Sequence, residues 1–162
     1  MRLVLRRAVA VAALFMLSIG ASLAAAAPEG GTGKLAYTEA VAPGGDLTLT
    51  FDESGQKRFA SVDYQLDATL IATFSSSSPT CGTEEQTISV LVDPPPTATV
   101  NGLVPDDKGH VAGPSASLVL DVSISSPLFC TTSARFDYTD VQLTNLTSGH
   151  VYRIDAISQS FP

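Results

Sequence analysis

The side chains that could do acid–base or metal chemistry in this sequence are few and widely spaced. The only histidines are His110 and His150, and each follows a glycine in a turn-rich stretch. A metal site or an acid–base pair would need carboxylates or cysteines at fixed spacing, and only Asp106 and Asp107 lie close to a histidine. Serine and threonine are plentiful, but none lies in a nucleophile motif or a phosphate loop. We therefore predict a non-enzymatic protein with no catalytic residue and no cofactor.

Two oxygen-rich turns are the secondary candidates for holding a cation. Asp52 and Glu53 begin one turn, and Asp106 and Asp107 begin the other. Neither turn has the alternating acidic spacing of a dedicated calcium loop, and Lys108 opposes a cation in the second. We predict no metal site. The four acidic residues are kept as candidates for an alternative function, a calcium- or carbohydrate-binding module.

The N-terminal segment 1–26 has the organisation of a secretion signal. A positively charged start precedes an apolar stretch and an alanine-rich end, namely Arg2, Arg6 and Arg7, residues 8–19, and Ala24–Ala27. The competing interpretation is a membrane anchor, but the small residues at the end favour cleavage. We predict a signal peptide over 1–26 and one domain over 27–162. This domain is expected to be extracellular or periplasmic, without membrane insertion after cleavage.

The charge balance limits the kinds of partner. Three of the nine basic residues lie in the predicted leader, whereas all sixteen acidic residues follow it. This acidity is spread along the chain and argues against nucleic acid and anionic membranes as partners. It is compatible with solubility, with a cation, or with another protein.

Cys81 and Cys130 are the only cysteines, and both follow the predicted leader. An even number of cysteines in an exported chain predicts one disulfide. Two cysteines without paired spacing do not make a zinc site. A bridge that closes a loop of about 50 residues would stabilise the fold by roughly 4 kcal/mol in the chain-entropy model.

Strict alternation of apolar and polar residues over Val62–Phe74 organises the chain. Its even positions are all apolar, and its odd positions are polar except for Ile71. The stretch Ser115–Ser125 repeats the pattern, with Val119 as its exception. Alternation of this kind is typical of a strand with one face in a core and the other in water.

Turn residues divide the rest into further strands. We predict bulges near Asp67–Thr69, where the inward residue shrinks, and at Thr139–Asp140, where the apolar parity changes. No stretch after the leader has a helical apolar period. Strands are expected over Lys34–Val41, Asp46–Asp52, residues 57–74, Gln86–Val92, Thr97–Leu103, Ser115–Ser125, Arg135–Leu143 and Val151–Ser158. Seven to eight strands without helices predict a β-sandwich or a barrel, and we expect an antiparallel β-sandwich that carries the one disulfide.

A motif near the C-terminus adds a resemblance at the level of the fold. Leu146, Gly149 and Tyr152 have a spacing that resembles the tyrosine corner of fibronectin type III and other immunoglobulin-like sandwiches. The resemblance implies an Ig-like sandwich in which the tyrosine hydroxyl bonds to the backbone. Only ten residues follow Tyr152, so the topology is expected to differ from that family or to lack an edge strand. Asn145 begins an overlapping glycosylation sequon, which applies if the source is eukaryotic.

These observations favour a secreted binding or structural module at the cell surface or outside the cell. We expect it to contact another protein through loops or through an exposed strand edge.

Overall fold

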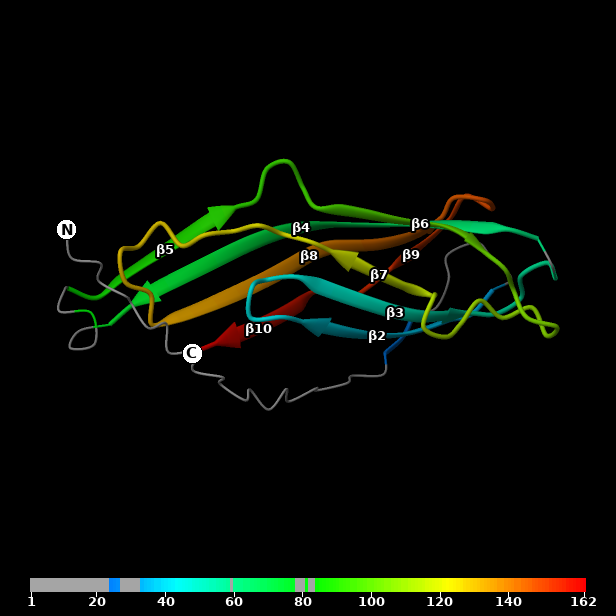
Figure 1. The fold of residues 1–162 in the computed structure, drawn as a ribbon, viewed down its shortest axis with the longest axis horizontal. Helices are drawn as coiled ribbons and strands as arrows, with labels where there is room; N and C mark the ends of the chain where they lie inside the picture. Colours follow the sequence, from blue (N-terminus) through cyan, green and yellow to red (C-terminus); the bar gives the residue numbers. More distant parts are fainter. Residues whose placement is uncertain (1–23, 27–32, 59, 78–80, 82–83) are drawn as a thin grey trace, which may run out of the picture.

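The computed structural model describes residues 24–26, 33–58, 60–77, 81 and 84–162. Within them the chain is all β, in two antiparallel sheets that form a sandwich (Figure 1). No helix in this part of the chain has the length and hydrophobicity needed to cross a membrane. The strands are β1 (Ala24–Ala26), β2 (Leu35–Val41), β3 (Leu47–Glu53), β4 (Val62–Ser76), β5 (Gln86–Leu91), β6 (Thr97–Leu103), β7 (Ser117–Leu120), β8 (Ser133–Asn145), β9 (His150–Arg153) and β10 (Ile157–Phe161).

The two sheets differ in width and in how their edges are built. The small sheet has the order β1-β2-β3-β7, and β1 lies within the predicted leader. The large sheet is built on β4 and β8, which lie side by side along the molecule (Figure 1). The free side of β4 pairs with β6 in one half and with β5 in the other. The free side of β8 is divided in the same way between β9 and β10.

The alternation predicted for Val62–Phe74 is confirmed by the burial of β4. Every even residue from Val62 to Phe74 is at most 5% exposed, whereas Ile71, the odd apolar residue, is 37% exposed. These inward residues pack against those of β2, β3 and β7 across the sandwich. The ring of Phe51 on β3 lies 4.7 Å from that of Tyr64 on β4, measured between centroids. The core therefore lies between the sheets.

The two predicted bulge positions meet in one bulge, whose extra residue lies on β8 as predicted at Thr139–Asp140 and not on β4. The register between β4 and β8 shifts between Asp67 and Thr69, opposite the extra residue of β8. On β8 the backbone of Asp140 has a φ of 51°. Because of this bulge, inward residues of different parity share one face, and Phe136, Tyr138, Val141 and Leu143 are all at most 2% exposed.

The predicted last strand, Val151–Ser158, is wrong as one element. The chain forms β9, leaves the ladder at residues 154–156, and pairs again as β10. The break lies opposite the β8 bulge, where the amide of Ile154 donates to the carbonyl of Val141 at 2.9 Å. The bulge interrupts the regular ladder of β8, so its neighbour forms two short strands. With β1 and this division, the eight predicted strands become ten.

Three other boundaries need correction. Within Ser115–Ser125 only β7 pairs in a ladder, although Ala116 and Val122 beyond its ends are also buried. The amide of Val122 bonds instead to the carboxylate of Asp46 at 2.9 Å. β4 begins at Val62, later than predicted, and β3 continues through Glu53, where the sequence predicts a turn.

Candidate functional site

Glu53 is the centre of a buried polar cluster between the sheets. Its side chain ends the inward row of β3 and is 1% exposed. The hydroxyls of Tyr64 and Tyr152 each donate to one of its carboxylate oxygens, and Asn145 Nδ2 donates to Oε2 at 3.0 Å. All three donors belong to the large sheet. One carboxylate of the small sheet therefore joins β4, β8 and β9 to β3.

The donors are held in their neutral forms by this arrangement. Burial, followed by the hydrogen bond to Glu53, raises the pKa of both Tyr64 and Tyr152. Gly33 lies directly over the cluster, because a Cβ there would be 3.0 Å from the Tyr152 hydroxyl and 3.3 Å from Glu53 Oε1. The cluster is closed and fully hydrogen-bonded, which suits a structural role between the sheets.

Asn145 and Tyr152 have different environments from those that their motifs suggested. Asn145, the sequon residue, is 0% exposed, and its amide nitrogen is used in the bond to Glu53. A glycan on that nitrogen would require the bond to open. Tyr152 donates to a side chain of the other sheet, whereas a tyrosine corner bonds to the backbone of its own connection. Leu146 and Gly149 lie exposed in the β8–β9 turn.

The two histidines have different partners. His110 Nδ1 is 2.9 Å from Asp52 Oδ1, and both side chains are about half exposed, at 40% and 45%. The ring of His150 packs edge-on against Tyr152 at 4.4 Å between centroids. The structure thus brings each histidine to one neighbour but does not join the two in one site.

The four candidate cation ligands lie in four different environments. Glu53 lies in the core and Asp52 contacts His110. Asp106 accepts the backbone amides of Lys108 and His110 at 2.9 and 2.8 Å, and the latter bond is the main cause of its lowered pKa. Asp107 is exposed. In the described residues no three His, Cys, Asp or Glu side chains converge as metal ligands.

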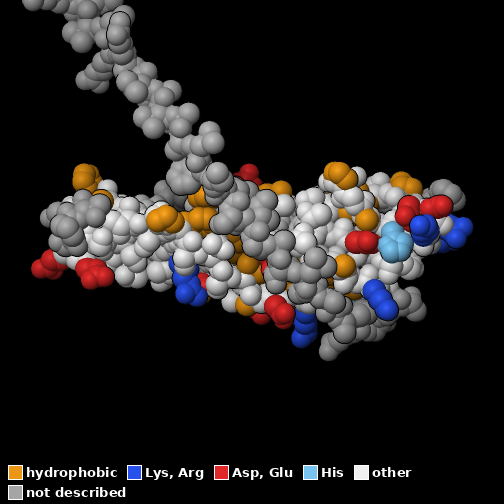
Figure 2. All heavy atoms as spheres, turned by 90° about the horizontal axis from the view of Figure 1, so that it is seen from below, with side chains coloured by type: hydrophobic (Ala, Val, Ile, Leu, Met, Phe, Trp, Pro, Cys, Tyr) orange, Lys and Arg blue, Asp and Glu red, His pale blue; other side chains and the backbone are white. Residues whose placement is uncertain are grey.

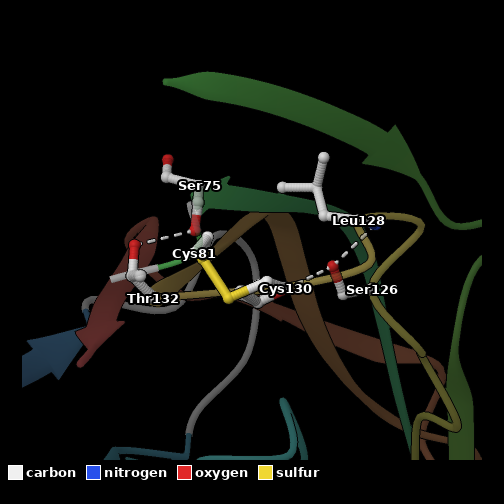
Figure 3. Close-up of a disulfide and its surroundings, with 7 residues drawn as sticks. Ser75, Cys81, Ser126, Leu128, Cys130 and Thr132 are labelled. Atoms are coloured by element: carbon white, nitrogen blue, oxygen red, sulfur yellow. Dashed lines mark hydrogen bonds between the residues drawn. A yellow bond between two sulfur atoms is a disulfide. The ribbon is translucent and has the colours of Figure 1, made fainter. Parts of the chain in front are cut away.

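The predicted disulfide is confirmed. Cys81 and Cys130 are bonded, with their Cα atoms 5.6 Å apart (Figure 3). The bond joins the segment after β4 to the loop before β8, at the end of the molecule where β5 lies (Figure 1). It crosses 49 positions of sequence, which include strands of both sheets.

The loop that carries Cys130 is also held by hydrogen bonds. Ser126 Oγ accepts the amide of Leu128 at 3.1 Å and the hydroxyl of Thr131 at 2.6 Å. The amide and hydroxyl of Thr132 donate to the carbonyl of Ser75 at 2.8 and 3.1 Å (Figure 3). The loop is therefore tied to itself and to the end of β4.

Phe129 lies in this loop, next to the disulfide, and is fully exposed. Its relative exposure is 104%, the highest of the large hydrophobic residues in the described chain, while Leu128 before it packs against the core. A tethered loop that turns one apolar residue inward and the next outward holds the outer one in a defined place. Phe129 is thus an aromatic side chain ready for contact on an ordered loop.

The other end of the molecule is polar and charged. Loops from β3–β4 and β6–β7 meet there through a backbone bond from Gln56 to Gly109 at 2.9 Å. Figure 2 shows Lys and Arg side chains together with acidic groups and a histidine at this end. Opposite charges are mixed, so the end does not offer a field of one sign.

Sequence reasoning missed the burial of Glu53, which it placed in a turn as a candidate cation ligand, and the exposure of Phe129. Glu53 could have been found, because it follows Leu47, Leu49 and Phe51 at the same parity and so points inward. Nothing in the sequence indicated that Phe129 would be exposed.

Comparison with protein-family models, with curated proteins and with solved structures finds no match for this chain.

Proposed function

We propose that this chain is a secreted, non-enzymatic binding module that contacts another protein through the disulfide-held loop Ser126–Thr132. The observation that carries the proposal is Phe129, fully exposed on a loop that a disulfide and several hydrogen bonds fix in place. The separate partners of His110 and His150 support a role without catalysis. A disulfide and the leader-like segment 1–26 support export.

An exposed phenylalanine does not gain the free energy that burial of its ring would provide. A buried phenylalanine side chain contributes roughly 1.5–3 kcal/mol relative to an exposed one, and Phe129 does not use this within its own fold. The same burial becomes available when a partner covers the ring. Because the loop is already ordered, little conformational entropy is lost on binding. Aromatic residues, phenylalanine among them, are enriched in protein interfaces relative to the rest of the surface.

The test is site-directed cross-linking in the secretome or at the surface of the source cells. A photoreactive amino acid replaces Phe129 in one sample and Val104 in a second, since Val104 is also apolar and 62% exposed. We expect one discrete adduct from position 129 that is absent at position 104. Excess wild-type protein should compete with the adduct, whereas the Phe129→Ser variant should not.

Equal adducts at both positions, or equal competition by Phe129→Ser, would contradict the proposal. If Phe129 anchors the interface, we expect its replacement to weaken binding by about 30-fold, equivalent to roughly 2 kcal/mol. Because the side chain is exposed, the substitution should leave the melting temperature unchanged, which separates lost binding from lost folding.

A further inference from the structure

Among the described residues, strand β5 is an edge strand with no other strand on its outer side. It pairs with β4 through Ile71–Ser76 on one side only. Among the hydrogen bonds of the described residues, none reaches the other side of β5. Its residues are exposed apart from the half-buried Val90, and Ile88 and Leu91 are 38% and 61% exposed. The backbone groups of this edge are therefore free to pair with another strand.

Edge strands normally carry features that prevent such pairing, and β5 carries none. Its sequence, QTISVL, has no charge, proline or glycine, and its register with β4 is regular. Three other edges are guarded: β6 contains a bulge at Gly102, β7 is only 4 residues long, and β9 carries Arg153. β10, with the sequence ISQSF, also lacks charge, proline and glycine, but its apolar residues lie only at its two ends. The guarding residues near β5, Glu84, Glu85 and Asp93–Pro96, lie outside the strand and only limit its length.

We propose that β5 pairs with the β5 strand of a second copy of this chain, antiparallel and with Ile88 on the two-fold axis. A two-fold axis perpendicular to the sheet keeps the faces continuous, so residues of equal parity meet. Ile88 then faces its own counterpart, and Thr87 faces Ser89. The large sheets of the two copies form one continuous sheet.

Charge disfavours the register with Ser89 on the axis, and apolar contact disfavours the one with Thr87 on the axis, because Ile88 would then face Gln86. With Ile88 on the axis, Glu85 of one copy lies opposite Leu91 of the other, and no acidic residues face each other across the described part of the junction. With Ser89 on the axis, Glu85 would face Asp93, and like charges directly opposite are unfavourable. The segment is self-complementary with Ile88 on the axis, which is why a second copy fits this edge.

Salt should strengthen the dimer. The chain has a formal net charge of −7, so two copies repel, while the paired strands themselves carry no charge. Screening removes the repulsion and leaves the backbone bonds and the apolar contact intact. A contact held by ion pairs would respond in the opposite direction.

The test is sedimentation equilibrium of the purified chain, with Ile88→Lys as the disrupting variant and Val119→Lys as its matched control. Val119 is 49% exposed on β7 of the small sheet, so the control makes the same change on another strand. We expect wild type and Val119→Lys to dimerise, more tightly at about 0.5 M than at about 0.05 M NaCl. Ile88→Lys should raise the dimer dissociation constant at least about tenfold, because two lysines meet on the axis.

Cross-linking tests the register and does not depend on the lysine variant. Cβ atoms of residues paired across strands are about 4.5–5.5 Å apart, so Ile88→Cys should form an intermolecular disulfide under mild oxidation. Gln86→Cys should not, because it faces Val90 of the other copy. A wild-type chain that stays monomeric at about 200 μM, far above the Kd of a specific dimer, would overturn the proposal. So would a dimer that Ile88→Lys leaves intact, or one that cross-links through Gln86→Cys.

Discussion

The Glu53 side chain, the only carboxylate in the described core, joins the two sheets through hydrogen bonds. Its removal should lower the free energy of unfolding. In the Glu53→Ala variant the hydroxyls of Tyr64 and Tyr152 and the amide of Asn145 lose their acceptor inside the core. We expect the free energy of unfolding to fall by about 3–5 kcal/mol. Urea denaturation of this variant and wild type measures the change.

The neighbouring Asp52 provides the control. Its side chain is 45% exposed and contacts His110 at the surface, so Asp52→Ala should change the free energy of unfolding by less than about 1 kcal/mol. A Glu53→Ala variant as stable as Asp52→Ala would mean that the buried donors find other acceptors, and the cluster would not be what joins the sheets.

The buried tyrosines determine how the free energy of unfolding should change at high pH. Burial raises the pKa of all four, Tyr37, Tyr64, Tyr138 and Tyr152, whereas the unfolded chain ionises near pH 10. Above pH about 10 the unfolded state therefore binds fewer protons than the folded state. The free energy of unfolding should fall by up to about 1.4 kcal/mol per pH unit for each tyrosine that stays protonated in the fold.

Absorbance at the tyrosinate band and circular dichroism, recorded together over this pH range, measure the effect. We expect the tyrosines to ionise in one step that coincides with loss of the β signal. A gradual ionisation near pH 10 with the sheet signal intact would show that the hydroxyls are accessible in the folded chain.

At the scale of elements, the turn between β2 and β3 depends on one glycine. Gly45 has a φ of 99°, and a Cβ there would lie 2.7 Å from the ring of Phe136. Its carbonyl also accepts the hydroxyl of Tyr138 on the other sheet. We expect Gly45→Ala to lower the free energy of unfolding by about 2–4 kcal/mol, because a strained φ and overpacking add.

The preceding residue allows a matched comparison. A Cβ on Gly44 would meet nothing within 4 Å, so Gly44→Ala should leave stability within about 0.5 kcal/mol of wild type. Thermal denaturation compares the Gly45→Ala and Gly44→Ala variants. Equal melting temperatures would mean that the β2–β3 turn accommodates a Cβ at position 45 without loss of stability.

Local alternation was enough to predict which residues of β4 and β8 enter the core. The parity of Val62–Phe74 and its change at Asp140 are properties of the chain itself, and both appear in the sheet. The extent of burial was not predictable in this way. Ile88 has the spacing of an inward residue, yet it lies on a strand at the sheet edge and is 38% exposed. Which strand becomes an edge depends on pairing between distant segments.

The candidate sites were less predictable than the fold for the same reason. The Cys81–Cys130 pairing followed from the cysteine count, but Phe129 is exposed because of how its loop is tied to Ser75, a contact across 57 positions of sequence. The division of the last strand into β9 and β10 likewise follows from the bulge in its partner. Such features arise from the neighbouring strand and leave no local pattern.

At the scale of the molecule, the disulfide should account for a sizeable part of the stability. Closing a loop of about 50 residues restricts the unfolded chain by roughly 4 kcal/mol in the entropic model. We expect the double variant Cys81→Ser/Cys130→Ser to keep its β signal and to lose about 2–4 kcal/mol of unfolding free energy. Urea titrations followed by circular dichroism measure both. Unchanged stability would mean that the Ser75–Thr132 bonds alone close this end.

The same covalent link decides what a single backbone cut would do. The prolines that follow β5 lie in a surface segment, Asp93–Pro96, between the two cysteines. A protease that nicks the chain there leaves two fragments still tied by cystine and by shared sheets. Under denaturing conditions the nicked protein would migrate as one species until a reductant is added, and only then would it separate into two fragments.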